Sequence, residues 1–347
     1  MKKIAVVLFN LGGPDSLEAV QPFLFNLFND KAIIGAPQPF RWIIAKLISS
    51  RRARIAREIY SALGGKSPLL ENTQVQAEAL EQTLRASRPN DEIRCFIAMR
   101  YWHPMADQTS ALVRDWGADS VVLLPLYPQY SVTTTSSSFR DWHRASASAG
   151  LSADIHAICC YPKSLKFTGA VADRLREEIN ATEDIDSVRV IFSAHGLPKK
   201  VVDSGDPYKW GIEQTAAMVI NATGVDGLDW VIAYQSRVGP LEWIKPYTDD
   251  EIRRAGEENK RLILVPIAFV SEHSETLVEL DIEYRELARK SGVPGYKRVG
   301  TVGDDDSFIA GLRLLVDDAL SREPGLHGPD GKHICPSFCT KCPLLEL

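Results

Sequence analysis

This sequence of 347 residues has few cysteines, no very long apolar run and no strong charge imbalance. No segment approaches the roughly 18 uninterrupted apolar residues of a transmembrane helix, which excludes that class. Six cysteines, three of them crowded near the end, do not resemble the disulfide framework of a secreted domain. A net charge of −5 argues against a general nucleic-acid binder. What remains is a soluble globular protein, long enough for two domains.

Two segments resemble known signals only in part. The start has a basic tip and a short apolar run, but the run ends at residues 10–14 (NLGGP) without a small-residue cleavage site. We therefore expect a first strand here and a cytoplasmic protein. Residues 64–67 (GGKS) end like a phosphate-binding P-loop, yet Tyr60 stands where its first glycine belongs and Pro68 disfavours a following helix. No nucleotide is implied.

Four apolar runs that each end in a turn or polar motif predict buried parallel strands. They lie at residues 5–9, 121–126, 188–192 and 262–270. Helical patterns between them supply the βαβ connections of an α/β fold. A local sequence similarity between two of these runs indicates two related doubly wound lobes. Each would be a parallel sheet flanked by helices, with a cleft between the lobes. The run rich in Ala, Ser and Gly at residues 145–153 marks the expected boundary.

Acidic side chains are concentrated after the last of these runs. An α-helical continuation places four carboxylates within an arc of about 80°, at about 100° per residue: Glu272, Glu275, Glu279 and Glu283. An amphipathic helix with a solvated acidic face explains such a stripe by itself. Open α/β sheets, however, bind ligands just beyond the carboxyl ends of their strands. In that position the stripe would attract a cation or accept protons.

His195 is the sharpest single candidate outside this stripe. It stands between a strand end and residues 196–198 (GLP), which would hold it at the carboxyl edge of the sheet. A purely structural histidine is the competing interpretation. Because His195 comes from a different strand than Glu275, it could face that carboxylate and pair a nitrogen ligand with an oxygen ligand.

Two further segments have more than one interpretation. Residues 31–57 contain no acid but carry seven basic residues among apolar ones. They could lie on an anionic membrane surface, form a core-facing helix with basic edges, or meet an amphiphilic anionic ligand. The hydroxyl-rich residues 131–138 lead into a helix expected to begin near Phe139. Helix capping and a flexible loop explain most of these hydroxyls, and the others could line the cleft.

Taken together, the motifs resemble the ferrochelatase family, enzymes that insert ferrous iron into a porphyrin in haem biosynthesis. The matching segments run in order over residues 5 to about 320: 8–14 (LFNLGGP), 64–68 (GGKSP), 99–104 (MRYWHP), 126–131 (LYPQYS), 192–198 (FSAHGLP), 205–208 (GDPY), 234–240 (YQSRVGP) with Trp243, and 265–284. The resemblance implies two Rossmann-like lobes around a porphyrin cleft. The expected divisions are a lobe at 1–150 with a lip at about 31–57, a lobe at 151–325, and a cysteine-bearing tail at 326–347.

The resemblance also implies roles for individual residues. His195 and Glu275 would be the catalytic pair that meets the Fe²⁺ substrate, and the resemblance leaves open which is the base and which the ligand. The remaining acids would continue a path for protons or metal: Glu272, Glu279 and Glu283. The expected macrocycle contacts are Leu11, Arg51, Arg52, Arg100, Tyr101, Tyr208 and Trp243. The resemblance favours the membrane interpretation of residues 31–57, as a lip that meets both membrane and porphyrin.

Three thiols lie close together near the end, at Cys335, Cys339 and Cys342. Their spacing suits an iron–sulfur cluster or zinc, although three sulfurs are one short of four, and free thiols are the third possibility. Some ferrochelatases hold a [2Fe–2S] cluster with three such cysteines and one interior cysteine. Here Val132 stands where the animal pattern has the interior cysteine, so Cys159 or Cys160 is the expected fourth ligand.

The resemblance thus predicts a protoporphyrin ferrochelatase, a lyase that is cytoplasmic and peripherally associated with the inner membrane. Its substrates would be a porphyrin and ferrous iron, and its resident cofactor a [2Fe–2S] cluster. Two alternatives are weighed against it: the same reaction on coproporphyrin III, and a tetrapyrrole carrier that binds without metallating.

Overall fold

The computed structural model describes residues 1–182 and 184–345, and these residues fold into two compact units. The first unit comprises Met1–Cys160 and Leu312–Lys332. The second comprises Tyr161–Gly311 and His333–Leu347. The change from one unit to the other thus falls about ten residues beyond the predicted boundary run, and residues 312–325 join the first unit rather than the second. The physical reason is a short strand at Gly325–His327 that pairs with the first unit's sheet.

The described part of the first unit contains a five-stranded parallel sheet with the strand order β2-β1-β3-β4-β9. The strands are β1 (Lys3–Asn10), β2 (Glu92–Met99), β3 (Ser120–Pro125), β4 (Asp154–Ile158) and β9 (Gly325–His327). The side chains of β3 are buried along its whole length, and those of β1 from its second residue onward. Continuous apolar runs therefore became strands covered on both faces, as predicted.

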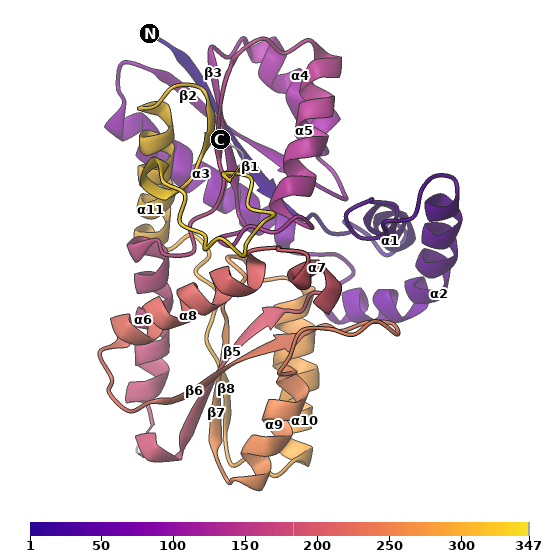
Figure 1. Ribbon diagram of the computed structural model, residues 1–347, viewed down its shortest axis with the longest axis vertical. Helices are drawn as coiled ribbons and strands as arrows, with labels where there is room; N and C mark the ends of the chain where they lie inside the picture. Colours follow the sequence, from indigo (N-terminus) through magenta and orange to yellow (C-terminus); the bar gives the residue numbers. More distant parts are fainter. Residues whose placement is uncertain (183, 346–347) are drawn as a thin grey trace. The chain divides into compact units, whose positions relative to one another are not determined.

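The helices of this unit are α1 (Val20–Phe28), α2 (Phe40–Ala62), α3 (Leu69–Ser87), α4 (Ala106–Trp116) and α5 (Thr135–Ala149), with a short 3₁₀ turn η3 (Pro329–Gly331). α3 and α4 pack against the sheet, whereas α1 and α2 pack on each other and project away from it (Figure 1). α4 and α5 pack on one face through Val113, Trp142 and Ala145. α5 begins four residues before the predicted start, because the hydroxyl-rich segment itself enters the helix. Among the described residues, no helix is long and apolar enough to cross a membrane.

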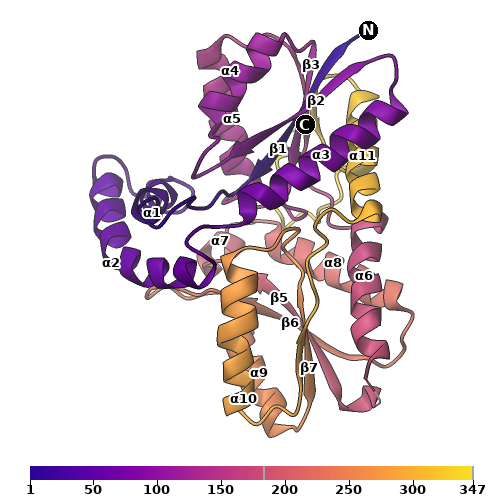
Figure 2. The same ribbon diagram turned by 180° about the vertical axis from the view of Figure 1, so that it is seen from behind.

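The described part of the second unit has a four-stranded parallel sheet in the order β6-β5-β7-β8. Its strands are β5 (Val188–His195), β6 (Asp229–Gln235), β7 (Arg261–Pro266) and β8 (Tyr296–Arg298). The helices are α6 (Leu165–Asn180), η1 (Ile185–Ser187), α7 (Lys199–Asp203), α8 (Tyr208–Thr223), α9 (Thr248–Glu257), η2 (Glu275–Tyr284) and α10 (Arg285–Lys290). α6 and α8 lie on one face of the sheet, and α9 and α10 on the other (Figures 1 and 2). α11 (Asp306–Leu320) begins in the second unit and ends in the first.

The strand order gives the second unit a topological switch point between β5 and β7. From β5 the chain passes to β6 on one side, and from β7 it passes to β8 on the other. Loops that leave neighbouring strands in opposite directions open a crevice at the carboxyl ends, which is where such folds bind ligands. The predicted fold class, two parallel sheets flanked by helices, is confirmed.

Candidate active site

The two residues predicted to meet the metal ion come together at the switch point of the second unit. His195 is the last residue of β5, and Glu275 begins the helix that follows β7. The imidazole Nε2 of His195 lies 3.8 Å from Oε1 of Glu275. Both side chains are partly open to solvent, at 40% and 23% exposure. An approaching cation could therefore reach both donors from one direction, and their role in metal binding stays a prediction.

Besides the two atoms that face each other, this pair has polar atoms with bonding capacity left over. Within the described residues, Nδ1 of His195 and Oε2 of Glu275 are buried atoms with no hydrogen-bond partner. Orphaned buried polar atoms are costly and often mark a place for a ligand. Two donors at a tetrahedral zinc ion with bonds of about 2.1 Å stand about 3.4 Å apart. The observed 3.8 Å is close to that span, so a small side-chain adjustment would let one ion bind both.

Trp243 and Gly196 fix the orientation of the His195 ring. The indole of Trp243 is nearly parallel to the imidazole, at 11° with ring centroids 6.3 Å apart, and its Nε1 donates to the carbonyl of Val238. A Cβ on Gly196 would lie 3.0 Å from the carbonyl oxygen of Gln235 and 3.1 Å from Cε3 of Trp243. Glycine is thus required here because the β6 backbone and the indole both approach the chain closely. Trp243, predicted as a macrocycle contact, lies beside the His195 ring.

The helix that carries Glu275 is a π-helix rather than the predicted α-helix. η2 keeps the i→i+5 winding over ten residues, whereas most π-helical segments are single turns that occur at functional sites. Glu272 lies outside this helix, so the predicted arc of four carboxylates on one helix does not form, whereas residues four apart in the wider winding still lie on one side. Glu272 lies before the helix, Glu279 on it, and Glu283 is exposed near its end.

Glu279 is bound to the end of the neighbouring strand β6. Its carboxylate accepts hydrogen bonds from the Ser236 amide at 2.9 Å, the Ser236 hydroxyl at 2.5 Å, Gln235 Nε2 at 3.1 Å and the Tyr284 hydroxyl at 3.1 Å. Ser236 takes a positive φ of 62°, which lets its amide and side chain both face the carboxylate. Burial and the nearby charge of Glu275 raise the pKa of Glu279, although the Ser236 bond acts in the opposite direction.

Glu272 is held by a guanidinium instead. Arg298, at the end of β8, donates from Nη1 to Glu272 at 2.8 Å and grips Asp281 of η2 with Nε at 2.8 Å and Nη2 at 2.7 Å. Burial by itself would raise the pKa of Glu272, but Arg298 and a bond from the Thr301 amide lower it on balance. Arg298 thus ties the residues before the π-helix to its middle.

His273 adds a second imidazole beside the pair. Its Nε2 lies 4.0 Å from Oε2 of Glu275, and its ring packs at a tilt against Phe269 with centroids 4.6 Å apart. Burial lowers the pKa of His273, although the charge of Glu275 acts in the opposite direction. No role for His273, Arg298 or Ser236 could be predicted from the sequence, because their parts depend on contacts between distant segments.

Five of the predicted macrocycle contacts belong to the first unit: Leu11, Arg51, Arg52, Arg100 and Tyr101. Arg51 and Arg52 are exposed on α2, and Leu11 packs beside the Tyr101 cluster. Tyr101 is almost fully buried, and its hydroxyl donates to Asp30 at 2.8 Å. Arg100 donates to the same carboxylate at 2.9 Å. The contacts of Tyr101 and Arg100 are thus internal to the unit, and porphyrin binding by any of the five stays a prediction.

The predicted lip corresponds largely to α2. This helix exposes a set of large apolar side chains: Phe40, Trp42, Ile43, Leu47 and Ile55. Only its small residues and Tyr60 are buried among the helix positions, which fits packing of one narrow side against α1. Of the interpretations left open for residues 31–57, a core-facing helix is the one that this exposure does not support.

The three cysteines of the tail gather in the second unit. Cys335, Cys339 and Cys342 are buried together with Trp210, Ile334 and Leu344. Ligand atoms of His333, Cys335 and Cys342 all lie within 4.8 Å of one another, so His333 is a candidate ligand that the spacing of cysteines alone did not reveal. Burial raises the pKa of the Cys339 thiol to about 11. Cys159 and Cys160 are buried in the first unit, and their part in a ligand set stays a prediction.

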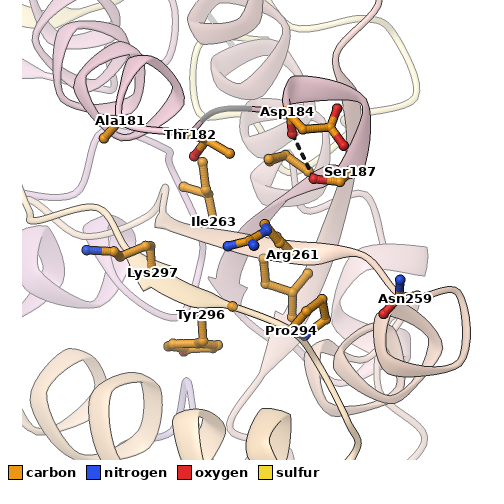
Figure 3. Close-up of a pocket in the computed structure, with 13 residues that line it drawn as sticks. Ala181, Thr182, Asp184, Ser187, Asn259, Arg261, Ile263, Pro294, Tyr296 and Lys297 are labelled. Carbon is orange, nitrogen blue, oxygen red and sulfur yellow. Dashed lines mark hydrogen bonds between the residues drawn. The ribbon is translucent and has the colours of Figure 1, made fainter.

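A pocket of about 600 Å³ lies at the opposite edge of the second unit's sheet (Figure 3). It is lined by residues at the amino ends of β5, β7 and β8, among them Ser187, Arg261 and Lys297. β5 spans eight residues, so at about 3.3 Å per residue the pocket is roughly 20 Å or more from His195. This pocket is therefore separate from the site predicted at the carboxyl edge of the sheet.

Comparison with known proteins identifies the family of this chain. The ferrochelatase family model matches residues 3–320. A ferrochelatase from Phenylobacterium zucineum is 51% identical over 340 residues, covering 98% of this chain and 97% of that protein. One from Caulobacter vibrioides (strain NA1000 / CB15N) is 49% identical over 345 residues, covering 99% and 98%. The chain belongs to the ferrochelatase family. This is a family of metal-chelating lyases of porphyrin biosynthesis.

Solved structures agree with this assignment at the level of fold. SirB from Bacillus subtilis with Fe³⁺ aligns with a TM-score of 0.52 at 14% identity, covering 92% of this chain and 96% of that one. The sirohydrochlorin chelatase SirB from Bacillus subtilis subspecies spizizenii, in complex with cobalt, aligns with a TM-score of 0.51. At such low identity the likeness extends to the two-sheet architecture and no further.

Proposed function

We propose that this member of the ferrochelatase family inserts Fe²⁺ into protoporphyrin IX to form protohaem, the final step of haem biosynthesis. The observation that carries the proposal is the pair His195 and Glu275, one nitrogen and one oxygen donor 3.8 Å apart at the switch point. Relatives that match over nearly the whole chain are named as the enzyme. Neither a non-catalytic carrier nor the coproporphyrin reaction is favoured by these names.

The residues suit the chemistry of metallation. Two pyrrole N–H protons must leave while nitrogen lone pairs turn toward the ion, which a flat macrocycle presents poorly. A site that binds a bent macrocycle would lower the barrier, because contacts with the rest of the ring offset the strain. An unprotonated His195 can accept a proton or ligate iron, and Glu275 can ligate iron or receive the second proton. Trp243 would keep the imidazole in one orientation for either role.

Within the predicted acidic path, the three carboxylates differ in their suitability for proton transfer. Glu279 lies on the same helix as Glu275 and has a raised pKa, so it takes up a proton more readily than an ordinary glutamate does. Glu272 is held as an anion by Arg298, so it would act through its charge. Glu283 is exposed and could pass protons to solvent. We propose the order Glu275, Glu279, Glu283 for outward transfer.

Contact with a membrane and a cytoplasmic location belong to the same proposal. The exposed apolar residues of α2 and its arginines would bury the apolar side among lipid headgroups and pair the basic side with anionic lipid. Arg51 and Arg52 on this helix would meet porphyrin carboxylates there. Porphyrin and haem are poorly soluble, so a site that takes them from a membrane surface is physically reasonable. Leu11, Arg100 and Tyr101 would support the macrocycle from the first unit.

The tail cysteines fit a metal centre made of soft ligands. Cys335, Cys339 and Cys342 are buried together, and a cation beside them would counter the burial that keeps a thiol such as Cys339 protonated. We propose that they hold a [2Fe–2S] cluster, with Cys159 or Cys160 from the first unit, or His333 from the tail, as the fourth ligand. The cluster, when bound, would supply a redox-active centre and a covalent link for the tail.

A porphyrin titration tests the proposed function. Purified protein is mixed with protoporphyrin and Fe²⁺ or Zn²⁺, and the visible bands of free and metallated porphyrin are followed over time. We expect metalloporphyrin to form with the unaltered chain and with His143→Ala, a control at an exposed histidine of α5. His195→Ala should bind porphyrin with similar affinity but form no product. Porphyrin binding without metallation by the unaltered chain would instead support a carrier.

A further inference from the structure

The cysteine tail rests on the loop between α7 and α8. The amide of Lys341 donates to the carbonyl of Gly205 at 3.0 Å, and the Thr340 hydroxyl donates to the carbonyl of Ser204 at 3.3 Å. Gly205 has a φ of +99°, and a Cβ there would lie 2.1 Å from Oγ1 and 2.8 Å from the amide nitrogen of Thr340. The tail therefore docks against bare backbone, and a side chain at this glycine would displace it.

The first turn of α8 contacts this tail on one side and the end of β5, which carries His195, on the other. Trp210 packs against the three buried cysteines. Two residues earlier, the Tyr208 hydroxyl donates to the backbone carbonyl of His195 at 3.0 Å. Asp206 joins the docking loop to this turn, because its Oδ1 accepts a hydrogen bond from the Tyr208 amide at 2.9 Å. A short chain of contacts thus runs from the tail through one helical turn to His195.

We propose that the docked tail positions His195. Gly205 is the residue against which the tail docks, and Tyr208 is the positioning residue that transmits the effect to His195. This inference rests on the proposed function and names a role for the tail beyond holding a metal centre. Release of the tail would free the loop at Gly205, loosen the first turn of α8 and let the end of β5 move. Trp243 would still stack on the imidazole, so we expect a weaker grip on the metal ion rather than complete loss of activity.

Such coupling is a free energy that links docking of the tail to the position of His195, and each of the two affects the other equally. Anything that stabilises the docked tail, including ligation of its cysteines, would favour the productive position of His195. Conversely, loss of the Tyr208 hydrogen bond would leave the tail docked but end its influence on His195. Release of the tail from Gly205 and loss of the Tyr208–His195 hydrogen bond should thus have different effects, so single substitutions can test the proposal.

The first test compares two glycines that both have a positive φ. Gly205→Ala introduces a Cβ into the tail, whereas Gly224→Ala, at the other end of α8, has a φ of +69° and open space around its Cβ. Hydrogen exchange of the protein as purified, followed by mass spectrometry, reads the tail at residues 334–345 and the end of β5. We expect faster exchange in both segments for Gly205→Ala and in neither for Gly224→Ala. Faster exchange in the tail alone would overturn the coupling.

Metallation kinetics give the second test. We expect Gly205→Ala and Tyr208→Phe to lower kcat/KM for Fe²⁺ by about fivefold or more, the small end of typical couplings, with the KM for porphyrin changed less than twofold. Because the coupling is reciprocal, Tyr208→Phe should speed exchange in the tail slightly, and less than Gly205→Ala does. Normal kinetics for Fe²⁺ in both variants, or a rise in porphyrin KM with Tyr208→Phe, would refute the positioning role. An unaltered chain that forms no metalloporphyrin would refute the proposed function instead, while the exchange data would still decide the coupling.

Discussion

Arg298 should be the main electrostatic support of the π-helix that carries Glu275. Its side chain is only 10% exposed and makes three close contacts with two carboxylates, Glu272 and Asp281, each about a quarter exposed. Removing one partner of a fully buried ion pair costs about 3–5 kcal/mol, and an exposed pair contributes about 0–1 kcal/mol. Water would partly reach the two carboxylates, so Arg298→Met should destabilise the second unit by about 2–3 kcal/mol at pH 7.

The pH dependence of that loss follows from Glu272. Its folded-state pKa lies below the ordinary value of 4.5 because Arg298 outweighs the effect of burial. The stabilisation is therefore fully present above the unfolded pKa and disappears as the pH falls through the lower, folded value. In Arg298→Met, only the bonds from Thr276 and Thr301 still oppose the effect of burial, so the carboxylate protonates more readily. The difference between variant and unaltered chain should thus be largest near pH 7 and shrink below about pH 5.

Urea unfolding at several pH values from 7.5 to 4 measures this prediction. Arg289→Met is the matched control, because Arg289 also makes two 2.8 Å contacts with a carboxylate, Glu286, but lies on the exposed face of α10. The control should change little at any pH. The loss of stability in Arg298→Met could instead be as small as in the control, or independent of pH. Either result would show that the ion pairs of Arg298 do not stabilise η2.

Two further predictions concern other supports of the fold and the site. Asp30→Asn should destabilise the first unit by about 2–4 kcal/mol in urea unfolding, since Arg100 loses its buried partner, and the loss should fade as the pH drops through the lowered pKa of Asp30. An unchanged midpoint at pH 7 would contradict it. Gly196→Ala should lower kcat for metallation up to roughly tenfold, because its Cβ meets the Trp243 ring that orients His195; full activity would mean that this packing does not control the imidazole.

The parts of the fold that depend on local pattern could be predicted from the sequence. The four apolar runs became β1, β3, β5 and β7, since a strand buried on both faces needs an uninterrupted apolar segment. The placement of His195 and Glu275 at strand ends followed from the same runs. The strand at Gly325–His327 was missed because three residues carry too little pattern, and its pairing with β4 depends on chain more than 150 residues away.

The details that were missed at the site also depend on distant contacts. Acidic residues four apart suit an α-helix in the sequence, yet η2 winds more widely. Its supports come from outside the helix, from Arg298 on β8 and Ser236 after β6. The macrocycle contact expected of Tyr208 stays a prediction, and the bond of its hydroxyl to the His195 backbone could not be predicted. Residue type and spacing indicated that these side chains matter, whereas only the folded chain shows what each of them touches.

The most direct test of the account is a crystal structure of the protein soaked in Zn²⁺, with anomalous diffraction used to locate the ions. We predict a zinc ion bound by Nε2 of His195 and a carboxylate oxygen of Glu275, at about 2.0–2.2 Å from each. Zinc at the tail cysteines would be compatible with this result. Zinc that saturates other sites while the space between His195 and Glu275 stays without density would contradict the claim that these two residues receive the metal ion.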